Sequence, residues 1–160
     1  EDKSYIITGA FGGVGLRVAL WLQLRGAKNI VLTTSGNAAK RNKNPIVEGL
    51  RSKGVNVTVC QCDISNINAV RKLFQETTPQ VGGIFHLANK FLPGLIPRTS
   101  LEQFHIAYDP KAKGALNLHL VSKDYPIDMF VLFSSVLDLL GNKGQAAYGA
   151  ANSFLGSLVE

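Results

Sequence analysis

An α/β fold with a doubly wound parallel sheet is predicted by three features of the sequence. Short apolar runs alternate with amphipathic segments along the chain, in the order βαβαβαβααβα. The apolar runs lack polar residues at alternate positions, which is typical of strands covered on both faces. Regular alternation of strands and helices favours right-handed crossovers between parallel strands. We therefore expect five strands in the order 3-2-1-4-5, with a crevice between strands 1 and 4, where the winding reverses.

The expected strands are short segments rich in β-branched and aromatic residues. None of these segments contains proline. Strands are predicted over residues 4–8, 29–33, 55–61, 83–87 and 129–133.

Residues that start and stop helices separate these strands. Pro45 suits a first helical turn, Gly26 suits a helix end, and Ser100 and either Ser65 or Asn66 suit N-caps. Helices are predicted over residues 13–25, 45–53, 67–76, 101–107, 110–123 and 146–159, with a polar loop over 35–44.

The chain has 160 residues, of which 46% are hydrophobic and 18% are charged. This size and composition fit one domain with a sizeable core and exclude a disordered or collagen-like chain. The sequence ends on an expected helix, where a sheet of this class usually continues. We therefore expect residues 1–160 to be a single domain excised from a larger polypeptide, truncated before its last strands.

The charge and cysteine content exclude several classes of protein. The net charge is +6, but the densest basic stretch, residues 40–43, has no aromatic residue to stack on bases, so we expect no nucleic-acid partner. No apolar run reaches the ~20 residues of a membrane span, and the N-terminus lacks the pattern of a signal peptide.

The three histidines show no metal-ligand spacing. Cys60 and Cys62 are expected to be free thiols in a reducing compartment, which favours a cytoplasmic location.

A glycine-rich stretch, TGAFGGVG, occupies residues 8–15, between the first expected strand and the first expected helix. Gly9 permits a tight turn, Gly12 and Gly13 let the backbone approach a pyrophosphate, and Gly15 lets the helix pack closely. The helix N-terminus would supply free N–H groups to the phosphates. The alternative is a turn that merely needs glycines. The pattern predicts a Rossmann-type dinucleotide site with these contact residues: Thr8, Gly9, Phe11, Gly12, Gly13, Val14 and Gly15.

Two further positions fit a dinucleotide. Asp63, after the third strand, could accept from an adenine amino group beside the Ile64 N–H, or it could simply cap the next helix. The second strand ends without the acidic residue that would hold a ribose 2′-hydroxyl and select NAD. Its hydroxyl side chains and the nearby Lys40 and Arg41 favour NADP instead; the hydroxyl-bearing candidates are Thr33, Thr34 and Ser35.

A serine, a tyrosine, a lysine and an asparagine stand at informative spacings. Ser135 follows the fifth strand, and Tyr148 lies 13 residues later on the last expected helix. Asn152 stands where a YxxxK motif would have its lysine, and Lys111 lies 24 residues before Ser135. With the glycine-rich stretch and the CDI sequence at residues 62–64, this pattern resembles the β-ketoacyl reductase (ketoreductase) domains of polyketide synthases and type I fatty acid synthases. Those domains belong to the short-chain dehydrogenase/reductase superfamily.

The resemblance covers essentially the whole chain and implies a function. It implies NADPH-dependent reduction of a β-ketoacyl thioester carried on the phosphopantetheine of an acyl carrier protein, within a homodimeric multidomain synthase. A substrate lid would lie beyond residue 160. The implied catalytic residues are Lys111, Ser135, Tyr148 and Asn152. Ala88 and Asn89 would lie at the nicotinamide, together with Lys111 and Tyr148.

This chemistry needs those residue types. A ketone that accepts a hydride gathers charge on its oxygen, and the hydroxyls of Ser135 and Tyr148 could donate to it. A phenol ordinarily has a pKa of about 10, so a nearby Lys111 ammonium should favour the phenolate left by proton transfer. By resemblance, Asn152 orders the relay that reprotonates Tyr148. The plain alternatives are a packing tyrosine, a solvated lysine and a surface amide.

Some positions depart from the family pattern. The arginine that the family usually carries just after the second strand is absent, and Asn89 stands where a glycine is common. His86, at the end of a buried strand, is interpreted as a packed or cofactor-edge residue. Two other functions stay open: a catalytically silent ketoreductase-like module, and a free-standing short-chain reductase, which Asn152 disfavours.

Overall fold

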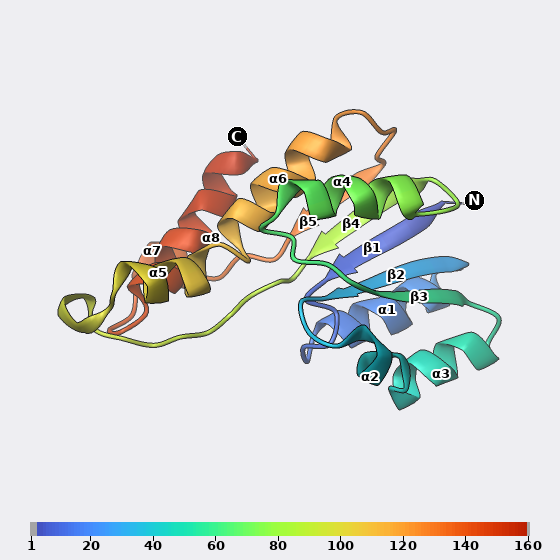
Figure 1. Ribbon diagram of the computed structural model, residues 1–160, viewed down its shortest axis with the longest axis horizontal. Coiled ribbons are helices and arrows are strands. Elements are labelled where there is room, and N and C mark those ends of the chain that lie inside the picture. Colours follow the sequence, from blue (N-terminus) through green and yellow to red (C-terminus); the bar gives the residue numbers. More distant parts are fainter. Residues whose placement is uncertain (1–2, 160) are drawn as a thin grey trace.

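Five parallel strands form the centre of the computed structural model, which describes residues 3–159 (Figure 1). Their order, β3-β2-β1-β4-β5, confirms the predicted doubly wound topology. The strands are β1 (Ser4–Thr8), β2 (Asn29–Thr34), β3 (Asn56–Gln61), β4 (Val81–His86) and β5 (Met129–Leu132).

Each predicted helix is present, with ends shifted by a few residues. The main helices are α1 (Gly15–Leu24), α3 (Pro45–Ser52), α4 (Ile67–Glu76), α5 (Leu101–Tyr108), α6 (Ala112–Ser122) and α8 (Ala146–Leu158). Three short elements complete the chain: α2 (Ala38–Asn42), the 3₁₀ turn η1 (Ile96–Arg98) and α7 (Leu137–Leu140).

Two apolar clusters cover the two faces of the sheet. Neighbouring residues of a strand point to opposite faces, so Ile6 packs toward α4 and α6 while Ile7 packs toward α1 and α3. Ile84 and Phe85 of β4 divide in the same way. Both faces are buried at the three central strands, so β1, β2 and β4 are mostly buried along their length, and each buried apolar side chain contributes about 1.5–3 kcal/mol. The edge strand β3 is more exposed.

Helix caps fix where two of the helices begin. The Asn66 side chain accepts from the N–H groups of Asn68 and Ala69, so Asn66 rather than Ser65 caps α4. Ser100 and Gln103 form a reciprocal capping box at the start of α5.

Several predicted boundaries were wrong, most of them by one or two residues. The stretch 35–44 is not all loop, because Asn37 accepts from the Lys40 N–H and starts the short helix α2. The helix expected from residue 110 begins at Ala112, since the preceding residues form a turn. Strand β4 begins at Val81, two residues earlier than expected.

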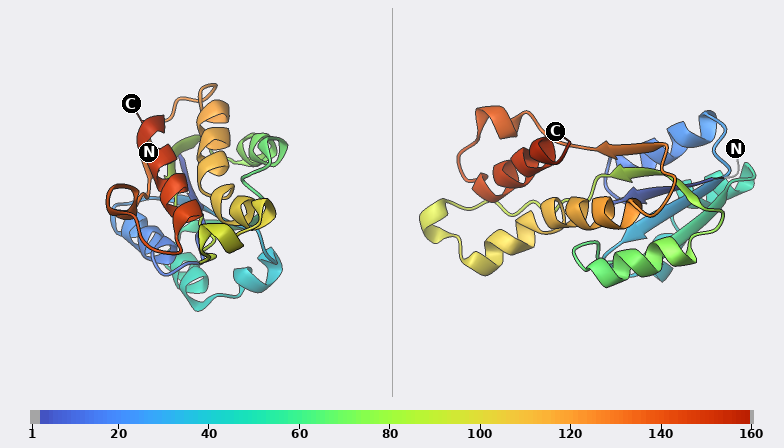
Figure 2. Two further views of the ribbon diagram at one scale, coloured as in Figure 1. Left: turned by 90° about the vertical axis from the view of Figure 1, so that its left-hand side faces the viewer. Right: turned by 90° about the horizontal axis from the view of Figure 1, so that it is seen from above.

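The helices α5, α7 and α8 lie beyond the carboxyl ends of the strands (Figure 2). Helix α8 packs against α5, α6 and α7. The carboxyl ends of all five strands therefore face this group of helices, which is where chemistry in parallel sheets is placed. Within residues 3–159, the structure has no helix long and apolar enough to span a bilayer.

The turn after β1 lies against the turn after β4. Gly9 has φ +62°, and a Cβ atom there would lie 2.7 Å from Ala88 Cα and from Leu87 O. Gly15 is equally restricted, since a Cβ atom would collide with the Ala10 backbone. Only glycine allows these backbones to approach, and the approach shapes the edge of the sheet.

Replacing Gly9 with alanine should destabilise the fold more than the same change at Gly26. Both glycines have positive φ, but a Cβ atom at Gly26 meets nothing within 4 Å. Gly26→Ala should cost about 1 kcal/mol of backbone strain, whereas Gly9→Ala adds a backbone clash and should cost more than about 2 kcal/mol. Pulse proteolysis in urea measures the unfolding of the two variants. Equal losses for the two variants would contradict the close approach.

Candidate active site

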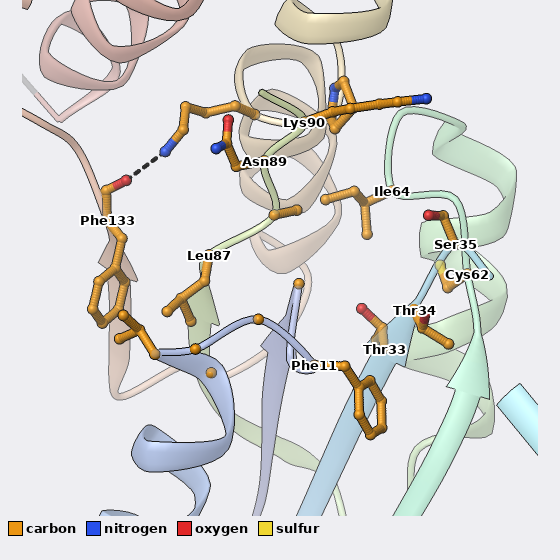
Figure 3. A pocket seen from close by; sticks show the side chains of 18 of the residues that line it. Phe11, Thr33, Thr34, Ser35, Cys62, Ile64, Leu87, Asn89, Lys90 and Phe133 are labelled. Carbon is orange, nitrogen blue, oxygen red and sulfur yellow. Dashed lines mark hydrogen bonds between the residues drawn. The ribbon is translucent and has the colours of Figure 1, made fainter. Parts of the chain in front are cut away.

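A cleft of about 650 Å³ opens at the carboxyl ends of the strands (Figure 3). It lies where the winding of the sheet reverses between β1 and β4. It is lined by residues from the glycine-rich turn, from the ends of four strands and from the starts of α6 and α8: Gly9, Phe11, Gly12, Gly13, Val14, Gly15, Thr33, Thr34, Ser35, Arg41, Cys62, Asp63, Ile64, Leu87, Ala88, Asn89, Lys90, Pro110, Lys111, Phe133, Ser134 and Tyr148.

Most of the residues predicted to bind or act at a dinucleotide meet in this one cleft. Three of the predicted residues do not line it: Thr8, Ser135 and Asn152. Of the lining residues, sequence reasoning did not assign Cys62, Leu87, Lys90, Pro110, Phe133 and Ser134 to the site. Each of them is next to an assigned residue in the sequence or lies at a strand end. That position could have identified them as lining residues from the sequence.

The glycine-rich turn forms an open cradle. Gly12 and Gly13 are exposed, and a Cβ atom at Gly13 would meet nothing within 4 Å. Helix α1 starts directly behind them, and no side chain caps its first N–H groups. Free N–H groups at a helix N-terminus, behind a turn without side chains, suit the two phosphates of a dinucleotide. The residues present therefore fit such a cofactor.

One end of the cleft is polar and holds a cation. Thr33, Thr34 and Ser35 line it without an acidic residue at the end of β2. The Arg41 guanidinium lies over the Phe11 ring, 5.4 Å from its centroid, and both residues line the cleft. The short helix α2 thus places a cation where the end of β2 has none.

Asp63 is exposed at the rim of the cleft and is engaged in a local turn. Its Oδ1 accepts from the Ser65 N–H at 3.0 Å and from the Ser65 hydroxyl at 2.6 Å. Because Asn66 caps α4, the alternative that Asp63 is the cap is wrong. The Ile64 carbonyl accepts from Asn117 Nδ2 at 2.9 Å, which fastens α6 to this wall of the cleft.

Lys111 is a buried cation at the other end of the cleft. Its side chain is only slightly exposed, and Nζ donates to the Phe133 carbonyl at 2.6 Å (Figure 3, dashed line). Burial lowers the pKa of this ammonium from 10.5 to about 8. Nζ lies 5.8 Å from the centroid of the Tyr148 ring. The fold thus brings together a lysine and a tyrosine that are 37 residues apart in the sequence.

Tyr148 is half-buried near the start of α8. The edge of the Phe91 ring meets its ring at a centroid distance of 6.0 Å. One turn later, Asn152 is fully buried, and its Nδ2 donates to the Tyr148 carbonyl at 2.7 Å. Within residues 3–159, Asn152 Oδ1 is buried without a hydrogen-bond partner. Asn152 therefore lies behind Tyr148 rather than on the cleft wall.

The two serines after β5 occupy different positions. Ser134 lines the cleft, whereas the Ser135 hydroxyl accepts from the Leu137 N–H at 3.3 Å, where α7 begins. Ser135 is half-buried. The spacing to Tyr148 pointed to Ser135, whereas Ser134 lines the cleft in this structure, because the turn into α7 decides which serine faces it.

Thr8 is fully buried beneath the cleft. Its hydroxyl lies 2.7 Å from His86 Nδ1 and accepts from the Ala88 N–H at 3.4 Å. Its side chain therefore cannot touch a ligand directly. It joins the ends of β1 and β4.

The arrangement can bind an extended, phosphate-bearing molecule and can transfer a proton at one end of it. The phosphate cradle lies between a polar end that holds Arg41 and an end where a phenol adjoins a buried ammonium. An ammonium next to a phenol stabilises the negative charge that forms when the phenol gives up its proton.

Comparisons with known proteins give a consistent result. A family described as "KR domain" matches residues 3–160. The highly reducing polyketide synthase GPY1 of Gibberella fujikuroi is 37% identical over 153 residues, which are 96% of this chain and 6% of that protein. The hybrid PKS-NRPS synthetase pyvA of Aspergillus violaceofuscus is 37% identical over 158 residues, which are 99% of this chain and 4% of that protein. The chain thus spans a small part of the curated relatives it matches.

Solved structures resemble the chain over nearly its full length. A ketoreductase domain from the bacillaene assembly line has a TM-score of 0.88 and 38% identity, and the match covers 98% of this chain and 38% of that one. The first ketoreductase of the tylosin PKS has a TM-score of 0.88 and 35% identity, with 99% and 35% covered.

The buried charge of Lys111 should cost stability in a pH-dependent way. The folded chain releases this proton near pH 8 and the unfolded chain near 10.5, so the cost is full below pH 8 and fades as the pH rises toward 10.5. Lys111→Met should therefore stabilise the fold by roughly 2 kcal/mol at pH 7 and by less at pH 9.5. Pulse proteolysis at the two pH values measures this change. Lys113→Met, at an exposed position on the same helix, is the control, and a gain that does not change with pH would contradict the buried charge.

Proposed function

The chain belongs to the ketoreductase (KR) domain family of polyketide synthases, and from this premise we propose that it reduces β-ketoacyl thioesters with NADPH. Domains of this family are NAD(P)-dependent oxidoreductases of the short-chain dehydrogenase/reductase superfamily, and their reaction is ketoreduction during polyketide synthesis. The observation that carries the proposal is the meeting of Lys111 and Tyr148 at one end of a cleft that has a phosphate cradle at its centre.

Tyr148 is the proposed acid. When bound, the reduced nicotinamide supplies a hydride to the keto carbon, and charge gathers on the keto oxygen. The Tyr148 hydroxyl donates a hydrogen bond to that oxygen and then gives it the proton. The Lys111 ammonium, 5.8 Å from the Tyr148 ring, stabilises the phenolate that remains. The hydrogen bond from Nζ to the Phe133 carbonyl keeps the ammonium aimed into the cleft.

Ser135 and Asn152 have supporting roles in the proposal. Ser135 would be the second hydrogen-bond donor to the keto oxygen, which requires its hydroxyl to turn away from the Leu137 N–H. Asn152 would order the reprotonation of Tyr148 through its Oδ1, which has no partner among the described residues, while its Nδ2 holds the Tyr148 carbonyl.

The preference for NADPH over NADH is assigned to the polar end of the cleft. The end of β2 has no carboxylate to hold a 2′-hydroxyl or repel a phosphate. Arg41 supplies a cation that Phe11 holds in place by a cation–π contact. Together with the hydroxyls of Thr33, Thr34 and Ser35, this end suits an adenosine 2′-phosphate.

The proposed substrate is an acyl chain held by a carrier protein. A second cavity, of about 410 Å³, lies between the loop after β4 and the start of α8, and it includes Ala147, the neighbour of Tyr148. Its walls are mostly apolar, with Leu92, Ile96 and Phe104 among them, which suits a hydrocarbon chain. We propose an acyl carrier protein with a phosphopantetheine-linked substrate as the partner.

The larger context is also a proposal. The small fraction of each relative that the chain matches supports one catalytic domain within a multidomain synthase, whose other domains are further partners. We propose in addition that this synthase is a homodimer. The free thiols of Cys60 and Cys62 fit the reducing cytoplasm.

Tyr148→Phe should reduce turnover by two or more orders of magnitude, because the variant lacks the acid and one donor to the keto oxygen. NADPH binding should survive. Ser135→Ala should lose about 100-fold, since one such donor contributes roughly 3 kcal/mol. Ser134→Ala is the matched control and should lose less. The assay follows NADPH oxidation with a β-ketoacyl thioester mimic, and near-normal turnover by Tyr148→Phe would refute the mechanism.

Arg41→Ala should weaken NADPH binding by about 10-fold or more and leave NADH binding nearly unchanged, because only NADPH carries the 2′-phosphate. Phe11→Leu should weaken NADPH binding less, since it frees the guanidinium without removing it. Calorimetric titration with both cofactors measures these affinities. Lys43→Ala, an exposed cation at the end of α2 that does not line the cleft, is the control. Equal losses for both cofactors would count against the 2′-phosphate assignment.

A further inference from the structure

His86 is a buried titratable group that the proposed mechanism does not use. It ends β4, is fully buried, and lies directly below the cleft. Both ring nitrogens are engaged: Nδ1 is 2.7 Å from the Thr8 hydroxyl, and Nε2 is 2.8 Å from the Lys111 carbonyl. The ring thus spans the space between the end of β1 and the start of α6.

The hydrogen-bond partners determine where the protons lie. A carbonyl can only accept, so Nε2 carries a proton and donates it to Lys111 O. Burial lowers the pKa of the ring to about 4; the hydrogen bond to the Lys111 backbone opposes this shift and the charge of Lys111 adds to it, so the ring is neutral near pH 7. Nδ1 is then unprotonated and accepts the proton of the Thr8 hydroxyl, whose oxygen accepts from the Ala88 N–H. One chain of hydrogen bonds runs from Ala88 through Thr8 and His86 to Lys111.

The bond to Lys111 fixes the residue that precedes α6. Lys111 is the N-cap of α6, and its carbonyl also accepts the first helical hydrogen bond, from the Ala115 N–H. Gly114 lets the helix approach the ring, since a Cβ atom there would lie 3.4 Å from His86 Cε1 and 2.8 Å from Ile64 Cδ1. The backbone of Lys111 is held from below by His86, and its Nζ is held from the side by Phe133.

We propose that His86 is a positioning residue for the reduction proposed above: by holding the Lys111 carbonyl, it keeps the Lys111 ammonium buried beside Tyr148. This inference rests on the proposed function for its catalytic meaning. The effect of His86 on the surroundings of the Lys111 amine can be measured even in the absence of enzymatic turnover.

Two substitutions separate the two hydrogen bonds of the ring. Gln reaches about as far as Nε2, so His86→Gln retains a donor for the Lys111 carbonyl and loses the acceptor for Thr8. Asn reaches only as far as Nδ1, so His86→Asn retains the Thr8 partner and releases Lys111. His119→Asn, the same substitution at a half-exposed histidine on α6, is the control.

The first readout is the ionisation of Lys111 itself. The full-length protein is acylated competitively across a range of pH. Mass spectrometry of the peptide that contains Lys111 then gives the pH midpoint at which this amine becomes reactive. The midpoint should lie near pH 8 in the unsubstituted protein. In His86→Asn it should rise by about one pH unit or more, because a released Nζ reaches water. It should stay near 8 in His86→Gln and in His119→Asn.

The second readout is the pH profile of thioester reduction. The rate should fall as the pH rises through the Lys111 midpoint, and His86→Asn should move this fall to higher pH and lower kcat about 10-fold. The other titratable groups that line the cleft are Tyr148, Cys62, Asp63, Lys90 and Arg41, and all are present in every variant.

The outcomes are distinct. An unchanged Lys111 midpoint in His86→Asn, or equal shifts in the Asn and Gln variants, would overturn the role of His86, whatever the activity. A shifted midpoint in His86→Asn alone would support it. Absence of thioester reduction by the unsubstituted protein would overturn the proposed function instead, and the acylation result would still decide the link between His86 and Lys111.

Discussion

The parallel direction of all five strands is the constraint on which the site depends. It places every strand's carboxyl end at the same edge, so the glycine-rich turn, the end of β2, the turn after β4 and the end of β5 meet there without long loops. The close contact between Gly9 and residues 87–88 sets the floor of the cleft. The chemistry is then supplied by helices that begin at this edge, with Lys111 before α6 and Tyr148 at the start of α8.

Burial of a cation is the second constraint, and it opposes stability. Lys111 is almost inaccessible, with one carbonyl as its hydrogen-bond partner and a lowered pKa. Such a group is costly in an apolar surrounding, and the fold holds it through hydrogen bonds to its backbone and its side chain. The same low polarity strengthens the effect of the ammonium on the neighbouring phenol. Burial of the Lys111 ammonium therefore both lowers the stability of the fold and strengthens the stabilisation of the Tyr148 phenolate in the proposed reaction.

Sequence reasoning predicted the strands and their order because both depend on local patterns and on the handedness of crossovers. It placed most of the cleft for the same reason, since strand ends in a parallel sheet converge. It missed α2, because the polar sequence of residues 38–42 resembles a loop, and only the Asn37 cap makes it helical. It selected Ser135 by its spacing to Tyr148, whereas Ser134 lines the cleft, since a single turn decides which of them faces it. The partners of His86 are 78 and 25 residues away, so no local pattern could reveal its two hydrogen bonds.

In the proposed reaction, the cleft brings a reduced nicotinamide and a β-keto group together beside Tyr148. Isotope transfer can follow this reaction at the level of the atom that moves. The protein would be incubated with a β-ketoacyl thioester and NADPH deuterated at C4 of the nicotinamide, in separate samples for the two faces of the ring. We expect one deuterium at C3 of the β-hydroxyacyl product for one of the two faces, and at least about 100-fold slower formation of labelled product by Tyr148→Phe. Labelled product at an equal rate from Tyr148→Phe, or none from the unsubstituted protein with either face, would contradict the proposed reaction.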